Sequence, residues 1–167
     1  DAGVGVQTVV FEHNFTGTLT NYTITGQNSA EYFYNYSDLA AGTYVWRSYA
    51  NDTLGNRNVT DAFAYIVNKA ASTVNLTVNG TDDNITLSVG MTINLSGRII
   101  TPGTGDIELY RNGTRINSGL DVISNLSYFG YVADFNITVH YNETQNYTSS
   151  YETHFVNVRD LTQPSVL

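Results

Sequence analysis

The sequence predicts an all-β protein made of two tandem β-sandwich domains. Apolar and polar residues alternate with a period of two along short segments, and no segment shows the sustained spacing of an amphipathic helix. Turn signals separate these segments, and Asn112-Gly113 is the strongest hairpin signal among them. A chain of 167 residues that is 41% hydrophobic and 13% aromatic can form one or two domains with apolar cores.

The stretch from Leu39 to Trp46 predicts a corner between two strands. A Gly follows three residues after Leu39, and Tyr44 follows two residues after that Gly. In immunoglobulin-like sandwiches a Tyr in this position returns its hydroxyl to the backbone upstream. Trp46, the only Trp, occupies the place of a disulfide Cys of such a domain, and we expect it to fill that core position. A plain Gly turn before a Tyr-rich strand is the alternative.

A domain boundary is expected where the alternation of the strand from Ala62 to Val67 ends, because a new alternating run begins at Thr73. The first domain has only about five expected strands, whereas an immunoglobulin-like domain usually has about seven. We therefore predict two immunoglobulin-like β-sandwich domains, the first of them short of strands. The assigned ranges are an N-terminal domain at 1–69, a second domain at 70–160 and a Pro-broken tail at 161–167.

Fourteen of the nineteen asparagines begin an Asn-x-Ser/Thr acceptor sequence for N-glycosylation. Because Ser and Thr make up 34 of the 167 residues, chance would place only about four asparagines in such sequences. We interpret the excess as the mark of a densely N-glycosylated extracellular or cell-surface protein. A Thr-rich pattern of exposed strands is the alternative. The predicted sites are Asn14, Asn21, Asn35, Asn51, Asn58, Asn75, Asn79, Asn84, Asn94, Asn112, Asn125, Asn136, Asn142 and Asn146.

Strand geometry connects these acceptor sequences to the fold. Residues i and i+2 of a strand share a face, so the Asn and the Thr point outward together while the middle residue points inward. Two acceptor sequences, Asn79-Gly80 and Asn112-Gly113, also fit hairpin turns. The middle residues are mostly apolar and are expected in the cores: Phe15, Tyr22, Val59, Leu76, Ile85, Leu95, Leu126, Ile137 and Tyr147.

The N-terminal segment predicts a strand over residues 3–15. Val4, Val6, Thr8 and Val10 share one face of it and form a candidate assembly strand. Our hypothesis is that one copy donates this strand to the first domain of a neighbour, which lacks strands. Head-to-tail addition of this kind produces an open filament. Pairing of the segment within its own domain is the alternative.

The sequence contains no catalytic constellation, and we predict neither an enzymatic activity nor a cofactor. It has no Cys and no Gly-x-Ser-x-Gly motif. His13, His140 and His154 have no Glu or His at zinc-like spacing, so we interpret them as ordinary strand residues. Asp82-Asp83-Asn84 could touch a cation but lacks the ligand ladder of a calcium loop, and no metal site is predicted. The thirteen tyrosines follow strand periodicity, which favours core and sheet positions over a sugar-binding platform.

The composition limits the kinds of molecule that the protein is expected to bind. A net charge of −8, with one Lys and six Arg, argues against nucleic acid, which requires a basic face. No apolar run approaches the roughly 20 residues of a membrane-spanning helix. The expected partners are other copies of the chain and N-linked glycans.

Both halves of the chain contain stretches of sequence that resemble known surface proteins. The stretch from Gly42 to Ala70, with Tyr-Ala-Asn-Asp-Thr at 49–53, resembles the tandem immunoglobulin-like domains of archaeal cell-surface glycoproteins. The second half is similar to bacterial and archaeal immunoglobulin-like modules through Leu-Tyr-Arg-Asn-Gly at 109–113 and Asn-Tyr-Thr-Ser-Ser at 146–150. It lacks a Leu-x-x-Gly-x-Tyr corner, which leaves that detail open. These motifs are structural and occur in modules of many functions.

Together these observations predict a non-enzymatic structural subunit of an extracellular filament or coat that assembles head-to-tail. The alternative is a spacer or adhesin module of a larger cell-surface protein, binding a carbohydrate or protein ligand.

Overall fold

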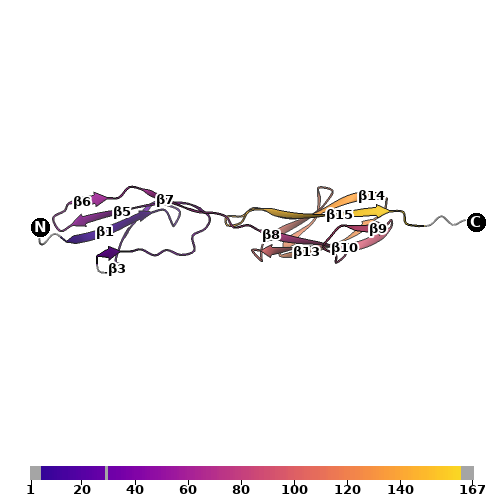
Figure 1. Cartoon of the computed structure of the whole chain (residues 1–167), viewed down its shortest axis with the longest axis horizontal. Helices are drawn as coiled ribbons and strands as arrows, with labels where there is room; N and C mark the ends of the chain where they lie inside the picture. Colours follow the sequence, from indigo (N-terminus) through magenta and orange to yellow (C-terminus); the bar gives the residue numbers. More distant parts are fainter. Residues whose placement is uncertain (1–4, 29, 163–167) are drawn as a thin grey trace, which may run out of the picture. The chain divides into compact units, whose positions relative to one another are not determined.

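The computed structural model describes residues 5–28 and 30–162, and all the regular secondary structure in them is β-strand. The all-β prediction is confirmed. None of the described segments forms a helix with the length and hydropathy needed to cross a membrane. The chain divides into two compact units, Asp1–Lys69 and Ala70–Leu167 (Figure 1). Val4 of the candidate assembly strand and residues 163–167 of the predicted tail lie outside the described residues.

The first unit is one broad antiparallel sheet with a minimal second layer. Strand β1 lies between β2 and β5, and β6 and β7 both pair with the far edge of β5. Strands β3 and β4 form a separate two-stranded ribbon. The unit has seven strands, more than the five or so expected, but β3 and β4 have only two residues each, so the second layer of the predicted sandwich is short. Its strands are β1 (Val6–His13), β2 (Thr20–Thr23), β3 (Gln27–Asn28), β4 (Glu31–Tyr32), β5 (Gly42–Asp52), β6 (Arg57–Val59) and β7 (Phe63–Val67).

The second unit is a fuller sandwich of two sheets. A three-stranded sheet has the order β13-β10-β8, and a five-stranded sheet has the order β12-β11-β14-β15-β9. All pairs are antiparallel except β15 with β9. The strands are β8 (Thr73–Val78), β9 (Ile85–Ser88), β10 (Met91–Thr101), β11 (Asp106–Arg111), β12 (Thr114–Leu120), β13 (Val122–Phe129), β14 (Ala133–Tyr141) and β15 (Ser150–Arg159).

The two sheets of the second unit enclose an apolar core. Every second residue along β8 and β14 is buried, as the period of a strand with one covered face requires. Full burial of a Leu, Ile or Val side chain contributes about 1.5–3 kcal/mol, so this core stabilises the unit strongly. Its members are Val74, Leu76, Val78, Ile93, Leu95, Ile99, Ile107, Leu109, Ile123, Phe129, Phe135, Ile137, Val139, Tyr141, Val156 and Val158.

The first unit buries far fewer side chains than the second. Among its described residues only Ala41 and His13 are buried. Its aromatic rings instead pack on one another: the ring centroid of Phe11 lies 5.2 Å from Trp46 and 5.6 Å from Tyr34. Trp46 is therefore half-buried in an aromatic cluster rather than enclosed in the closed core expected for it. A single sheet with a four-residue ribbon lacks the second layer that would cover these rings.

The corner at Tyr44 and the two Asn-Gly turns form at the residues where the sequence predicts them. The Tyr44 hydroxyl donates a hydrogen bond of 2.7 Å to the carbonyl oxygen of Ala40, the bond that defines a tyrosine corner. Both Asn-Gly turns have two residues at positive φ, 53° and 80° at Asn79-Gly80 and 50° and 76° at Asn112-Gly113. A type I′ hairpin turn requires this conformation, which Asn and Gly adopt at least cost.

Two segments are shorter strands than their residues predict. The aromatic run at residues 30–34 predicts a strand, but only Glu31–Tyr32 of it forms one, in the ribbon. The apolar residues from Ser127 to Ala133 also predict a strand, but β13 ends at Phe129, because residues 130–132 connect it to β14.

Candidate functional site

All fourteen acceptor asparagines lie within the described residues, and none of them is buried. Five are half-buried: Asn14, Asn51, Asn75, Asn125 and Asn136. Nine are exposed: Asn21, Asn35, Asn58, Asn79, Asn84, Asn94, Asn112, Asn142 and Asn146.

Most of the half-buried asparagines donate a hydrogen bond from their amide nitrogen, and the exposed Asn142 also does so, to Glu108 Oε2 at 3.4 Å. That nitrogen carries the glycan in an N-glycosylated protein. Four of the five half-buried residues donate it to another group: Asn14 to the Thr43 carbonyl at 3.4 Å, Asn51 to Gln7 Oε1 at 3.1 Å, Asn75 to Asp82 Oδ2 at 2.8 Å and Asn125 to Ser127 Oγ at 2.9 Å. Asn125 is the extreme case, because its partner is the Ser of its own acceptor sequence and is only 4% exposed.

The expected inward direction of the middle residues holds for Leu76, Leu95 and Ile137, which are fully buried. It is wrong for Val59, which is 51% exposed. Val59 ends β6, a three-residue strand that pairs only with β5 at the margin of the sheet, where no second layer covers it.

The prediction that the middle residue points inward is also wrong for Leu126, which is 75% exposed. The buried positions of β13 are Ile123, Ser127 and Phe129. Because side chains alternate strictly along a strand, this register turns Leu126 to solvent and its flanking acceptor residues toward the core.

The candidate assembly strand pairs within its own unit. Its described part lies in β1, between β2 and β5, with partners from Val6↔Asp52 to His13↔Trp46. A bulge between Val6 and Thr8 interrupts the strict alternation expected along this face. The alternative considered from the sequence, pairing of this segment in its own domain, is the arrangement in the structure.

Strand β7 presents apolar side chains to solvent. Phe63 is 46% exposed, Tyr65 57% and Ile66 61%. The strand pairs with β5 along Gly42 to Trp46. An apolar strand at the margin of a sheet favours pairing with another chain.

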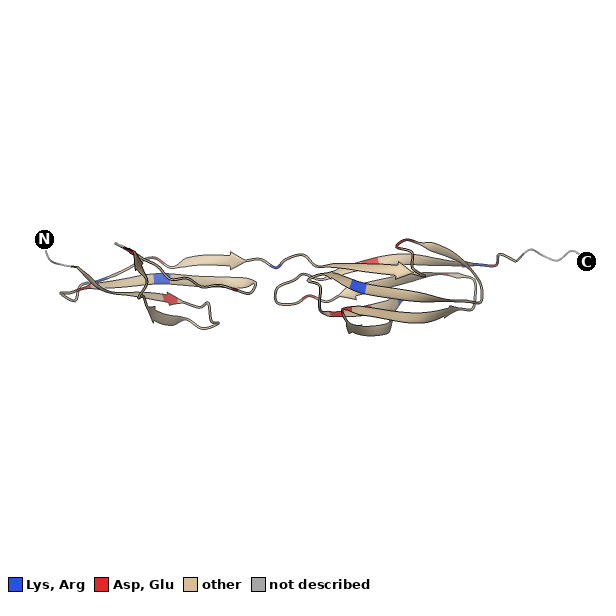
Figure 2. Cartoon of the chain, turned by 90° about the horizontal axis from the view of Figure 1, so that it is seen from below, with Lys and Arg blue, Asp and Glu red and all other residues tan. Residues whose placement is uncertain are grey.

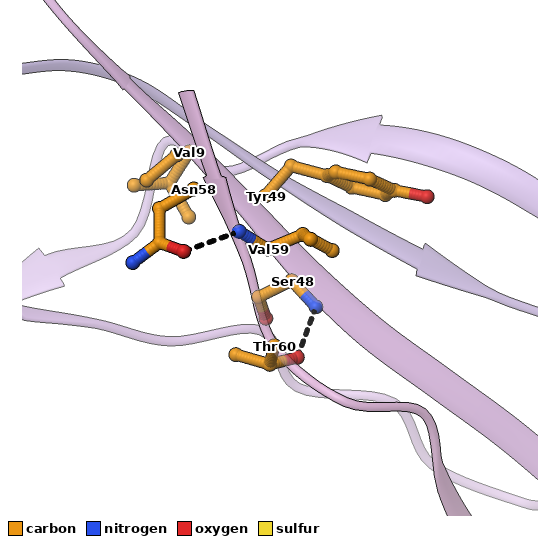
Figure 3. A pocket seen from close by; sticks show the side chains of 7 residues that line it. Val9, Ser48, Tyr49, Asn58, Val59 and Thr60 are labelled. Atoms are coloured by element: carbon orange, nitrogen blue, oxygen red, sulfur yellow. Dashed lines mark hydrogen bonds between the residues drawn. The ribbon is translucent and has the colours of Figure 1, made fainter. Parts of the chain in front are cut away.

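Several shallow hollows lie beside β1 and β5, with volumes from about 130 to about 310 Å³. The first, about 130 Å³, is lined by Val9, Tyr49 and Val59 and includes the acceptor residues Asn58 and Thr60 (Figure 3). The second, about 220 Å³, lies between the sheet and the ribbon. Both are smaller than the about 300–1,000 Å³ of typical small-molecule sites. The lining of the second hollow includes Phe11, Tyr32, Phe33, Tyr34 and Trp46.

His13 is fully buried in the first unit, which the sequence did not indicate. Its ring stacks between Phe15 and Tyr22, at centroid distances of 4.2 and 4.3 Å. Nδ1 accepts the Phe15 backbone N–H at 3.1 Å, and the buried Nε2 has no hydrogen-bond partner among the described residues. Burial lowers the pKa of His13, because the charged imidazolium loses its hydration.

Charged residues are sparse along both units (Figure 2), and several of them form ion pairs. Arg47 contacts Glu12 in the first unit, and Arg115 contacts Glu108 in the second. The hydrogen bond from Arg47 lowers the pKa of Glu12. The pKa of Glu108 is lowered first by the hydroxyl of Tyr110, which donates at 2.6 Å, and then by Arg115.

Asp82, Glu152 and His154 come together on the second unit. His154 Nε2 lies 3.0 Å from Asp82 Oδ1 and 3.9 Å from Glu152 Oε1. The sequence contained part of this signal, because Glu152 and His154 stand at i and i+2 and share one face of β15. Asp82 is 72 residues from His154 in the chain, so its proximity could not be inferred from spacing.

No family model and no curated protein matches this chain. Among solved structures, the chain is similar to the fibronectin(III)-like modules of CbhA from Clostridium thermocellum, with 14% sequence identity and a TM-score of 0.40. The match covers 100% of this chain and 86% of that chain. A similarity at this level assigns neither a family nor an activity.

Proposed function

We propose that this chain is a densely N-glycosylated, non-enzymatic structural protein of an extracellular filament or coat. We further propose that it belongs among the archaeal cell-surface glycoproteins that its sequence resembles. The observation that carries the proposal is the surface placement of all fourteen acceptor asparagines, in both units. Glycans attached to them would cover a surface that has few charges and many apolar groups. Hydrated glycans keep such a surface soluble.

Mass spectrometry of native material tests the glycosylation. The bare chain has a mass of 18.4 kDa, and we expect an intact mass well above it. Glycopeptide mapping should find glycans on Asn79 and Asn112, whose turns are exposed. Asn125 should be unmodified when transfer follows folding, since both polar groups of its acceptor sequence are bonded to each other. An intact mass equal to that of the bare chain would refute the proposal.

Head-to-tail assembly by strand donation belongs to the same proposal. Because β1 lies between β2 and β5 of its own unit, donation requires that each copy releases this strand and passes it to the next copy. The small enclosed core of the first unit supports this route, since few buried contacts oppose the release of β1. The exposed β7 offers a second surface for a neighbouring copy.

A disulfide that locks β1 to β5 tests whether assembly requires the release of β1. Val9 and Ala50 are register partners, and the Val9 carbonyl accepts the Ile24 N–H on the opposite side at 2.8 Å. They therefore form a non-hydrogen-bonded pair, whose Cα separation of about 4.5 Å suits a disulfide. The chain has no Cys of its own, so Val9→Cys with Ala50→Cys introduces a single bridge.

The expected result is that the reduced variant forms filaments in electron micrographs and the oxidised variant does not. A second bridge between Thr138 and Thr153, register partners in the other unit, controls for oxidation itself. Filaments from the oxidised Val9–Ala50 variant would place assembly on another surface, such as β7.

A spacer or adhesin module is the second candidate, favoured by the aromatic hollow between the sheet and the ribbon. Tyr34 and Phe33 there are 37% and 47% exposed, and aromatic faces stack well on the apolar faces of sugars. Trp46 lines the same hollow and is the only Trp of the chain. A saturable change of its fluorescence with neutral oligosaccharides would support this candidate, and an unchanged spectrum at millimolar sugar would exclude these ligands.

A further inference from the structure

We propose that Asp82, Glu152 and His154 bind a divalent transition-metal ion of the Zn²⁺ type on the second unit. Each offers one ligand atom, and the three atoms all lie within 4.8 Å of one another. One imidazole nitrogen and two carboxylate oxygens form a donor set that Zn²⁺ accepts. Two carboxylates also balance the charge of a divalent ion.

The two distances from His154 to the carboxylate oxygens fit one shared ion. Zn²⁺ binds imidazole nitrogen and carboxylate oxygen at about 2.0–2.2 Å. Two donors of one ion are then about 3.0 Å apart at a right angle and at most about 4.2 Å apart in line. His154 Nε2 lies 3.0 Å from Asp82 Oδ1 and 3.9 Å from Glu152 Oε1, within this range.

The remaining carboxylate oxygens are held by other groups. Glu152 Oε2 accepts the backbone N–H of Leu76 at 2.5 Å, and Asp82 Oδ2 accepts the Asn75 side-chain amide at 2.8 Å. These bonds leave Oε1 and Oδ1 for the ion. Such hydrogen bonds to ligating groups orient them and raise metal affinity.

The site joins two parts of the second unit. Asp82 lies between β8 and β9, whereas Glu152 and His154 lie on β15. The His154 side chain is 13% exposed and that of Asp82 57%, so the ion would be open to solvent on the Asp82 side. A fourth ligand, water or a group from another molecule, has access there. A bound ion would tie the segment before β9 to β15 and stabilise the unit.

The test is a titration of metal-free full-length protein with ZnCl₂, followed by the side-chain ¹⁵N signals of its three histidines. We expect saturation at one ion per chain, with a dissociation constant below about 0.1 mM, and a shift of the His154 signals alone. The melting temperature of the second unit should rise by about 4 °C or more in excess Zn²⁺ and return with EDTA.

Matched variants separate an ion site from a simple His–Asp hydrogen bond. Asp82→Asn and Glu152→Gln keep an oxygen for the bonds from Asn75 and Leu76, so they preserve the fold while removing a charged ligand. Each should weaken Zn²⁺ binding at least about tenfold, and His154→Gln should abolish it. The control His140→Gln, on β14, should bind as the native chain does.

Three outcomes would overturn the proposal. The first is no saturable binding below 1 mM Zn²⁺, on the order of the weakest measurable affinities. The second is binding of unchanged strength in His154→Gln. The third is a shift of the His13 or His140 signals in place of those of His154. Any of these would leave His154 and Asp82 as an ordinary hydrogen-bonded pair.

Discussion

His13 sits where an uncharged ring is required. The rings of Phe11, Phe15, Tyr22 and Tyr34 contact it, with Tyr36 at the edge, and no charged side chain is among its ring contacts. The accepted Phe15 N–H places the remaining proton on Nε2, which is buried without a partner. A buried, unpaired donor costs about 1–3 kcal/mol, so this residue weakens a unit that already has little core.

The first prediction is that the first unit loses stability as the solution becomes mildly acidic. The pKa of His13 in the folded chain is below its unfolded value of about 6.5, so the unfolded chain binds the proton more readily. Its stabilising contribution is therefore complete above about pH 6.5 and falls as the pH decreases toward the folded pKa. Urea unfolding at pH 7.5 and 5.5, followed by the fluorescence of Trp46, measures this unit selectively.

His13→Phe retains the stacked aromatic ring and cannot titrate. We expect its unfolding free energy to be nearly equal at the two pH values. An unchanged pH dependence in this variant would show that another group is responsible.

The second prediction concerns the tyrosine corner. Tyr44→Phe removes the hydroxyl that donates to Ala40 and should destabilise the first unit by about 1 kcal/mol, the usual net value of one hydrogen bond. Trp46 fluorescence in urea is again the measurement. Tyr65→Phe, an exposed position on β7, is the matched control and should change stability by less than about 0.5 kcal/mol. An equal loss of stability in the two variants would show that the hydrogen bond of the corner does not stabilise the unit.

At the scale of elements, β10 and β14 face each other across the core of the second unit at unusually close range. A Cβ at Gly97 would lie 2.5 Å from Val139 Cγ2 and 3.1 Å from Val139 Cβ. Real Cβ atoms do not approach other carbons so closely, so the sheets could not keep this spacing with a larger residue.

The third prediction is that Gly97→Ala destabilises the second unit by about 1–3 kcal/mol, the usual cost of overpacking. This cost should exceed the gain of about 0.4–1 kcal/mol from a less flexible unfolded chain. Calorimetry of the variant measures it, with Thr92→Ala on the exposed face of β10 as the control. An equal or higher melting temperature for Gly97→Ala would mean that Val139 moves away freely.

Across the whole molecule, carboxylates in both units are stabilised in their charged form. In the first unit, a hydrogen bond from Arg47 is the largest cause that lowers the pKa of Glu12, and one from the Asn56 side chain lowers that of Asp52. In the second unit, a hydrogen bond from Tyr110 is the largest cause that lowers the pKa of Glu108, and one from Thr104 lowers that of Asp121. Each contributes stability above its unfolded pKa of about 4 and loses it as the pH falls through the folded value.

The fourth prediction is that both units lose stability below about pH 4.5, in addition to the loss near pH 6 confined to the first. Calorimetry at pH 7, 4.5 and 3 should show both transitions moving to lower temperature at the acidic end. Glu108→Gln should lower stability at pH 7 and reduce the acid dependence of the second unit alone. Transitions that stay fixed between pH 4.5 and 3 would contradict the prediction.

Much of this protein follows from its sequence alone, because the responsible forces are local. The period of two predicts strands, the Asn-Gly pairs predict type I′ turns through their tolerance of positive φ, and the Leu-Gly-Tyr spacing predicts the bond from Tyr44 to Ala40. The acceptor sequences for glycans are also present in the sequence itself.

Tertiary structure decided everything that depends on strand register and on which strands meet. Leu126 is outside because β13 pairs with β10 in one register, and a shift by one residue would bury it. His13 is buried because Tyr22 of the neighbouring strand β2 and Tyr34 of the loop after the ribbon pack on its ring. Asp82 reaches His154 only because the sandwich brings the end of β8 beside β15. Alternation along one strand holds no information about its neighbours, so only the folded chain determines these contacts.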